Sequence, residues 1–205
     1  MAYPVDFDVE PPDEFDKAQL LLRVLIIIVA YWIFHAVLGF AYFVLPVVAA
    51  ILVSQKGAVA YLDEAETGPT RWLRVIMGLF SYIALATDNA SLDNPDHVEL
   101  DIQPTGSPTV GSALLRLITG IPHAIVLSIL GIVFAIAWLF AAVSILVNGE
   151  YPEWASSFIR GYLRWWARFL AYMASVVDEY PPFSFEGGDM VAALPPAAGE
   201  TPPEA

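Results

Sequence analysis

Two long stretches without a charged side chain constrain this chain more than any other feature. Residues 24–53 and 117–147 contain no Asp, Glu, Lys or Arg. A membrane-crossing helix needs about 20 apolar residues, whereas a helix of about 30 residues would measure about 45 Å. We therefore expect each run to lie in lipid as one kinked crossing, because glycines and prolines interrupt both. A hairpin that re-emerges on the side it entered is the alternative. The interrupting residues are Gly39, Pro46, Gly120, Pro122 and Gly131.

The composition is not that of a soluble domain. Hydrophobic residues make up 58% of the 205 residues and charged residues only 15%, against about a quarter in an average globular chain. The net charge of -13 argues against nucleic acid as a partner, because binding phosphates takes clustered Lys and Arg. With no cysteine, the chain has no disulfide and no thiolate metal site.

Two shorter apolar stretches, 75–86 and 169–177, each follow a basic aromatic segment. Counted from their arginines, both reach about 20 residues, and an arginine near a helix end can extend its guanidinium to the head groups. We expect both to cross the membrane, with an amphipathic helix lying in the interface as the close alternative for the second. Its side chains predicted to contact lipid or a partner protein are Arg160, Arg164, Arg168, Trp165 and Trp166.

The second half of the chain repeats the pattern of the first. A shift of 93 residues aligns segment 5–11 with 98–104, and a shift of 90 aligns segment 74–88 with 164–178. Several segments agree in the same order, so chance similarity between apolar runs is a poor explanation.

We therefore predict a mainly helical membrane domain that is internally duplicated, with about four membrane helices and one short β-strand before each repeat. The first repeat comprises residues 1–92, with a strand at 4–10 and helices at about 17–54 and 69–88. The second comprises residues 93–186, with a strand at 97–103 and helices at about 111–147 and 154–178. Residues 187–205 are an acidic Pro/Ala tail, for which we expect disorder.

The strand predictions rest on alternation. Val5, Phe7 and Val9 alternate with acidic residues, as in a half-buried strand, and residues 98–102 repeat the pattern. An isolated strand is not stable, so we expect the two to pair with each other or with a partner chain. Extended linkers are an equally good interpretation of segments this short.

The distribution of Lys and Arg predicts an orientation. If each half crosses twice, the loops after the long runs and their flanks carry six basic residues, and the opposite side carries three. The positive-inside rule then places the loops in the cytoplasm and both termini in the periplasm. A hairpin course changes the number of crossings and could put everything on the cytoplasmic side.

A set of motifs in the second half resembles a known family. They are Arg116, Gly120-Ile121-Pro122-His123, Trp138, Asn148-Gly149-Glu150-Tyr151-Pro152, Gly161-Tyr162-Leu163-Arg164-Trp165, Ala171-Tyr172 and Asp178-Glu179-Tyr180-Pro181-Pro182-Phe183. Over residues 98–186 they resemble the bacterial membrane-protein family called domain of unknown function 4389. The first half resembles it more loosely, because it lacks the Gly-Ile-Pro-His turn. The resemblance implies a multi-pass protein of the bacterial inner membrane, and it implies no catalytic residue.

Four charged residues sit at equivalent edges of the apolar runs. Asp88 and Asp178 end equivalent helices and could form structural ion pairs with Arg23 and Arg116. The simpler interpretation is that all four mark the edges of the hydrocarbon.

His35 and His123 lie within the uncharged runs, where an imidazole could bind haem or a metal. Neither has a second ligand three or four residues away, and they do not align in the repeat. We favour a structural role for both, with His123 as a partner for a carbonyl freed by Pro122.

Three functions remain open at this point. The leading one is a non-enzymatic accessory or scaffold subunit of a larger membrane complex or a homo-oligomer, without a cofactor, acting through protein–protein contacts of its strands, aromatic helices and acidic tail with other subunits or the lipid bilayer around it. A small transporter or lipid-binding protein is the alternative. A haem or redox protein that uses His35 and His123 is the third.

Overall fold

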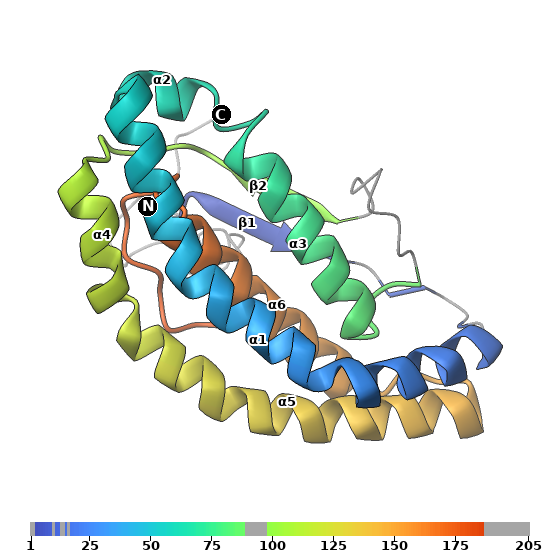
Figure 1. Ribbon diagram of the computed structural model, residues 1–205. Coiled ribbons are helices and arrows are strands. Elements are labelled where there is room, and N and C mark those ends of the chain that lie inside the picture. The colour runs from blue at the N-terminus through green and yellow to red at the C-terminus, as the bar shows by residue number, and fades with distance from the viewer. Residues whose placement is uncertain (1–2, 10, 13–14, 16, 89–97, 187–205) are drawn as a thin grey trace, which may run out of the picture.

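The computed structural model describes residues 3–9, 11–12, 15, 17–88 and 98–186, and the side chains at 18–19, 26 and 28–38 lie outside this description. Figure 1 shows two long helices, α1 and α5, beside a shorter pair, α3 and α6, and a two-stranded sheet. The predicted tail at 187–205 and the side chain of His35 fall outside the described residues. The elements in chain order are β1 (Val5–Asp8), α1 (Lys17–Lys56), α2 (Ala58–Asp63), α3 (Pro69–Ile83), β2 (Glu99–Ile102), α4 (Val110–Thr119), α5 (Ile121–Asn148) and α6 (Glu153–Met173).

The two predicted strands pair with each other. β1 and β2 are antiparallel, and Phe7 lies directly opposite Leu100. One face of the sheet is buried, with Phe7 at 1% and Leu100 at 4% exposure, whereas Asp6 and Asp101 are exposed on the other face. The alternation in the sequence thus predicted both the strands and the side they bury, and the linker interpretation is wrong for residues 5–8 and 99–102.

The two long apolar runs differ in whether they form one helix or two. α1 continues without a break through Gly39 and Pro46, whereas the second run is divided at Gly120 into α4 and α5. Pro122 lies in the first turn of α5, where its missing N–H costs nothing, so it starts a new helix and prevents α4 from continuing. The stretch Gly39–Lys56 and the whole of α5, Ile121–Asn148, are each long and apolar enough to cross a membrane.

α3 and α6 both end earlier than predicted, at Ile83 and Met173, because each closes in the same left-handed turn. Leu85 has φ 62° and Ser175 has φ 58°, although neither is glycine. The backbone N–H of the next residue donates a hydrogen bond to a carbonyl in the last turn of the helix. Ala86 donates to the Ser81 carbonyl, and Val176 donates to the Ala171 carbonyl. Two such turns at non-glycine residues cost conformational energy, so neighbouring contacts must hold them.

α6 lies between the sheet and the long helices. Arg164 on one side of α6 contacts β1, while Tyr162 and Trp166, each two positions away and so on about the opposite face, contact α5 and line the gap toward α1. Fourteen of its residues are buried, among them Arg168. α6 is therefore the central helix of the molecule, and Figure 1 shows α1 passing in front of it.

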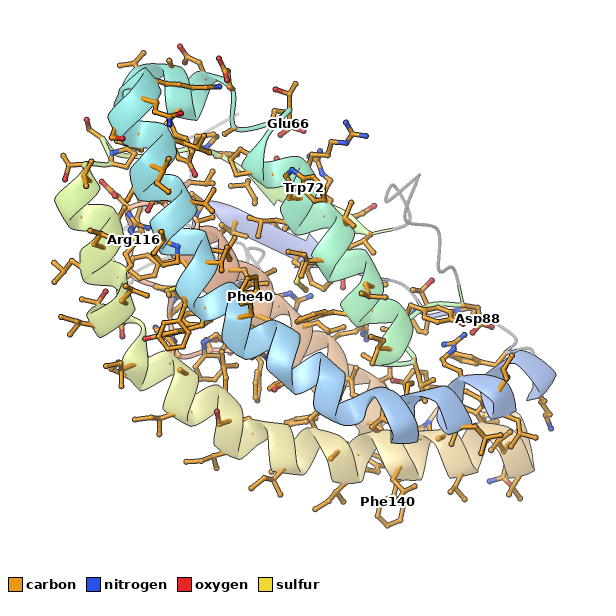
Figure 2. All side chains as sticks on the ribbon, in the orientation of Figure 1. Phe40, Glu66, Trp72, Asp88, Arg116 and Phe140 are labelled. Atoms are coloured by element: carbon orange, nitrogen blue, oxygen red, sulfur yellow. The ribbon has the colours of Figure 1, made fainter. Side chains whose placement is uncertain are left out.

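Apolar side chains cover the outer surfaces of α1, α4 and α5. In Figure 2, Phe40 projects toward the viewer from α1 and Phe140 projects away from α5. Both are more than 60% exposed. Exposed residues on α5 recur every three or four positions and form a stripe along its length. We call this surface the apolar face; its large exposed residues are Leu21, Leu22, Leu25, Phe40, Phe43, Val47, Val48, Ile51, Val110, Leu114, Leu115, Ile118, Ile121, Ile125, Ile129, Ile132, Val133, Ile136, Leu139, Phe140, Val143 and Val147.

Candidate functional site

The four charged residues at the edges of the apolar runs form two ion pairs. Arg23 Nη2 lies 2.6 Å from Asp88 Oδ1, and Arg116 Nη2 lies 2.5 Å from Asp178 Oδ1. Both guanidinium groups are almost fully buried, and Figure 2 shows Asp88 and Arg116 at opposite ends of the molecule. The simpler interpretation, that these residues only mark the edges of the hydrocarbon, is therefore wrong.

Each arginine also closes the end of a helix. Arg23 donates to the carbonyls of Tyr82 and Thr87 at 3.1 Å, and its guanidinium carbon lies 3.9 Å from the centre of the Tyr82 ring. These carbonyls surround the left-handed turn after α3, where backbone acceptors lack partners in the helix. A cation at a helix carboxyl end also interacts favourably with the helix dipole.

Arg116 makes the same contacts at the end of α6. It donates to the carbonyls of Tyr172 and Val177 and lies 4.4 Å from the centre of the Tyr172 ring. Tyr61 of α2 donates to the next free carbonyl, that of Ala174. Burial raises the pKa of the Tyr61 hydroxyl to about 12. The turn after α6 is thus held by a guanidinium and a phenol.

The arginine row of α6 faces protein. Arg164 Nε donates to the Phe7 carbonyl at 2.9 Å, and its other nitrogens bond the Phe185 carbonyl and Asp8. Arg168 is 3% exposed and donates to the carbonyls of Ser184 and Glu186. The expectation that this row contacts lipid or a partner protein is wrong for Arg164 and Arg168. β1 and the segment after α6 take the place that lipid head groups were expected to have, and Arg160 is half-buried on the same row.

The two tryptophans expected beside this row at the membrane surface also point inward. Trp165 is 4% exposed, and its indole N–H donates to Nδ1 of His123 at 3.0 Å. Trp166 packs partly buried against Phe80 of α3. Trp165 is therefore not an interface anchor in this fold, whereas Trp166 is only partly buried.

His123 is fully buried in a cluster of aromatic rings. Its imidazole stacks on Phe183, with ring centroids 4.1 Å apart, and lies 4.7 Å from Tyr180. The sequence suggested that His123 would bond a carbonyl freed by Pro122. The hydrogen bond observed is instead to the indole of Trp165. In the part of the chain that the structure describes, no three His, Cys, Asp or Glu side chains are grouped to hold a metal ion. His123 therefore fixes the segment after α6 against the start of α5.

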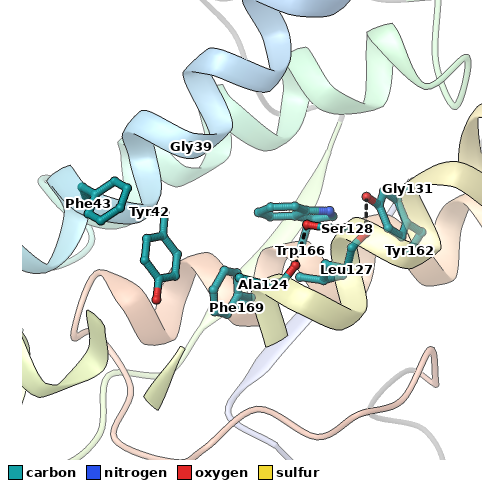
Figure 3. Close-up of a pocket in the computed structure, with 10 residues that line it drawn as sticks. All are labelled: Gly39, Tyr42, Phe43, Ala124, Leu127, Ser128, Gly131, Tyr162, Trp166 and Phe169. Carbon is teal, nitrogen blue, oxygen red and sulfur yellow. Dashed lines mark hydrogen bonds between the residues drawn. The ribbon is translucent and has the colours of Figure 1, made fainter. Parts of the chain in front are cut away.

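A pocket of about 210 Å³ lies where α1, α5 and α6 meet. Figure 3 shows the indole of Trp166 in the middle of its lining. Gly39 and Phe43 are exposed on α1, and Ser128 is exposed on α5, so the pocket opens between these helices on the apolar face. The lining residues are Gly39, Tyr42, Phe43, Ala124, Leu127, Ser128, Gly131, Tyr162, Trp166 and Phe169.

The polar groups that line this pocket differ in whether they have a hydrogen-bond partner. The hydroxyls of Tyr42, Tyr162 and Ser128 each donate to a backbone carbonyl, at 3.2 Å for Tyr162 and 2.6 Å for Ser128. Trp166 Nε1 is buried and has no hydrogen-bond partner within the described residues. Because an indole nitrogen can only donate, Trp166 Nε1 is a buried donor in the lining for which the described residues supply no acceptor. This pocket could not be predicted from sequence patterns, because its residues come from three helices far apart in the chain.

Comparison with known proteins places the second half of the chain in a family. Residues 111–184 match the model of a domain of unknown function, DUF4389. The matched region runs from the start of α4 to the turn that Phe183 closes against His123, so it contains one complete arginine-capped helix end. This match supports the family resemblance that the motifs indicated, for residues 111–184. No curated protein and no solved structure matches the chain.

Proposed function

We propose that this protein lies in the interface of one membrane leaflet as a non-enzymatic accessory or scaffold protein. In this arrangement the apolar face is buried among acyl chains and the sheet faces water. The observation that carries the proposal is that the apolar face and the exposed carboxylates of the sheet, Asp6 and Asp101, lie on opposite sides of α6.

The sheet is the reason for preferring this arrangement to four crossings. β1 runs beside the middle of α6, where Arg164 bonds Phe7, and the same part of α6 contacts α5 through Tyr162. If α5 and α6 crossed the bilayer, the exposed carboxylates of Asp6 and Asp101 would lie within the hydrocarbon. A charged side chain at the bilayer centre costs about 3 kcal/mol or more. A helix that lies in the interface avoids this cost.

The lengths of the helices agree with the proposal. α1 has 40 residues and α5 has 28, which correspond to about 60 and 42 Å. A crossing helix needs only about 30 Å, whereas a helix that lies in the membrane plane has no such limit.

The multi-pass course and the periplasmic termini become the alternative, and the bacterial inner membrane stays a prediction from the family resemblance.

We also propose that the two halves are repeats related by a two-fold axis at the sheet. Phe7 and Leu100 are paired, and they are 93 residues apart, the same separation as Arg23 and Arg116. Arg164 of α6 donates to the Phe7 carbonyl, and Arg74 of α3 donates to the Leu100 carbonyl at 3.2 Å. Each half thus contributes a helix that holds the strand of the other half. This exchange supports a rigid anchor that presents partner surfaces, which is the role of a scaffold.

Single-cysteine labelling tests the placement, because the natural chain has no cysteine to remove. We would substitute Lys56→Cys, Asn148→Cys and Asp101→Cys and treat intact cells and inverted vesicles with a membrane-impermeant maleimide. The proposal predicts that all three react from the same side, and that Ile132→Cys on the apolar face is protected. Labelling of residues 56 and 148 from the side opposite to residue 101 would establish the crossing arrangement instead.

Co-purification in a mild detergent tests the accessory role. A partner that remains bound at fixed stoichiometry, and whose binding is weakened by Asp101→Lys on the water-facing side of the sheet, supports it. A monomer that carries no other protein contradicts it and favours the lipid-binding alternative. A homo-oligomer that Ile132→Lys dissociates would mean that a second copy covers the apolar face.

A further inference from the structure

We propose that the pocket between α1, α5 and α6 binds the ester end of one membrane-lipid acyl chain. The inference rests on the proposed position of the apolar face in the acyl region of a leaflet, and it goes further by naming a ligand and the residues that hold it.

The position of the pocket limits what can enter. Its rim is formed by Gly39 and Phe43 of α1 and by Ser128 of α5, all exposed. The rim belongs to the same surface as Phe40, Ile125 and Ile129, which are each more than half exposed. A ligand that reaches the pocket from this surface comes from the lipid phase, so it must itself be largely apolar.

The size and walls of the pocket fit part of a chain. An apolar cavity of about 150 Å³ is large enough to bind benzene, and this pocket is somewhat larger at about 210 Å³. Aromatic rings of Tyr162, Trp166 and Phe169 form the floor on α6. A Cβ added at Gly39 would meet no heavy atom within 4 Å, so glycine leaves that side of the entrance open.

The indole N–H of Trp166 determines which polar group a ligand must carry. Trp166 Nε1 is buried and has no acceptor among the described residues, and a buried donor left unsatisfied costs about 1 to 3 kcal/mol. The hydroxyls of Tyr42, Tyr162 and Ser128 already donate to backbone carbonyls, so none of them needs an acceptor from a ligand. The fitting ligand therefore carries one uncharged acceptor at the end of an apolar chain. The carbonyl of an acyl ester has this chemistry and is abundant just below the lipid head groups.

The test measures lipid retained by the purified protein. Native mass spectrometry of the full chain in a neutral detergent, with phosphatidylcholine added in increasing amounts, gives the number of bound lipids and their affinity. We expect one saturable lipid for the natural protein. Gly39→Leu, which places a side chain at the entrance, should weaken this binding at least tenfold, and the matched Gly111→Leu on α4 should not.

The acceptor contact is tested separately. Trp166→Phe keeps a ring but removes the donor, and it should weaken binding about fivefold, the factor that one neutral hydrogen bond contributes. Trp154→Phe, at an exposed position on α6, is the control. An ether-linked phosphatidylcholine, which lacks the ester carbonyl, should bind the natural protein as weakly as the ester lipid binds the Trp166→Phe protein.

The outcomes separate this inference from the proposed function. Flotation with phosphatidylcholine vesicles reports on the apolar face, and we expect all four variants to float like the natural protein. If they float but Gly39→Leu binds lipid as tightly as Gly111→Leu does, the pocket proposal is wrong and the placement stands. If the natural protein does not float, the placement is wrong. If it retains no saturable lipid, the pocket assignment is overturned.

Discussion

The indole N–H of Trp165 donates to Nδ1 of His123 at 3.0 Å, inside a cluster of aromatic rings that closes the segment after α6. Both residues are buried, His123 completely. A neutral imidazole that accepts at Nδ1 must carry its proton on Nε2, so this bond sets the tautomer. The histidine thus links the start of α5, the middle of α6 and the aromatic turn around Phe183.

The first prediction concerns this link. His123→Ala removes the acceptor of a buried indole and leaves a cavity, so it should lower the free energy of unfolding by about 2 to 4 kcal/mol. Thermal unfolding followed by tryptophan fluorescence measures the effect. Ser128→Ala, on the exposed side of α5, is the control and should change the midpoint little. An unchanged midpoint for His123→Ala would mean that the imidazole has another role, such as ligand binding.

The second prediction concerns the helix ends closed by arginine. Arg116→Ala leaves Asp178 and two buried carbonyls without their donor, so it should cost about 3 to 5 kcal/mol. Arg23→Ala should cost a similar amount, because its contacts are equivalent. Arg71→Ala, at an exposed position on α3, should cost less than about 0.5 kcal/mol. Equal midpoints for Arg116→Ala and Arg71→Ala in the same detergent would show that the capping contacts contribute nothing.

The third prediction distinguishes protein contacts of the α6 arginines from lipid contacts. Arg164→Met removes the donors to Phe7, Phe185 and Asp8, so it should lower stability by about 1 to 3 kcal/mol. Because the guanidinium is bound inside the protein, binding to phosphatidylglycerol vesicles should change less than twofold at a temperature where the variant is folded. A larger loss of vesicle binding than for Arg71→Met would restore the head-group role that the sequence suggested.

These residues show where the sequence was informative. The two strands and the long helix α1 could be predicted, because alternation and apolar length are properties of the sequence itself. The division of the second apolar run at Gly120 was not predicted, and ion pairs were only one of two interpretations of the four charged residues. The environment of the α6 arginines could not be predicted. A row of arginines every fourth residue shares a helix face, but the pattern is the same whether lipid phosphates or strand carbonyls receive the hydrogen bonds.

The limits of sequence patterns are also clear at the pocket and at α2. The pocket depends on how three helices cross, and Trp166 looks like an ordinary interface residue until α6 is seen between the sheet and α5. The short helix α2 lies in what was expected to be a loop, and its Tyr61 reaches the end of α6, which is more than a hundred residues away in the chain. Contacts between distant segments of this kind leave no periodic signal.

The fourth prediction tests the break between α4 and α5. A Cβ at Gly120 would lie 2.8 Å from the Arg116 carbonyl oxygen and 2.9 Å from Met173 Sδ. Gly120→Ala should therefore destabilise the protein by about 1 to 3 kcal/mol through overpacking. At Gly111 the nearest atom would be 3.9 Å away, so Gly111→Ala should be neutral or slightly stabilising. Thermal midpoints of the two variants measure the difference. Equal midpoints for Gly120→Ala and Gly111→Ala would contradict the close packing at Gly120.

The last prediction concerns pH. Burial raises the pKa of Tyr61 from its ordinary value of 10 to about 12 in the folded protein. Between these values the unfolded chain has lost the phenolic proton while the folded protein keeps it, so stability should fall as the pH rises through this window, by about 2 to 3 kcal/mol for this group. Tyr61→Phe cannot ionise and should lose less stability over the same range, although it starts lower by about 1 kcal/mol for the lost bond to the Ala174 carbonyl. Burial also raises the pKa of Tyr3 and Tyr151, so some alkaline destabilisation should remain in the variant. Unfolding midpoints measured from neutral pH to about 12 for both proteins check the difference, and parallel curves would mean that the Tyr61 hydroxyl ionises as freely as in water.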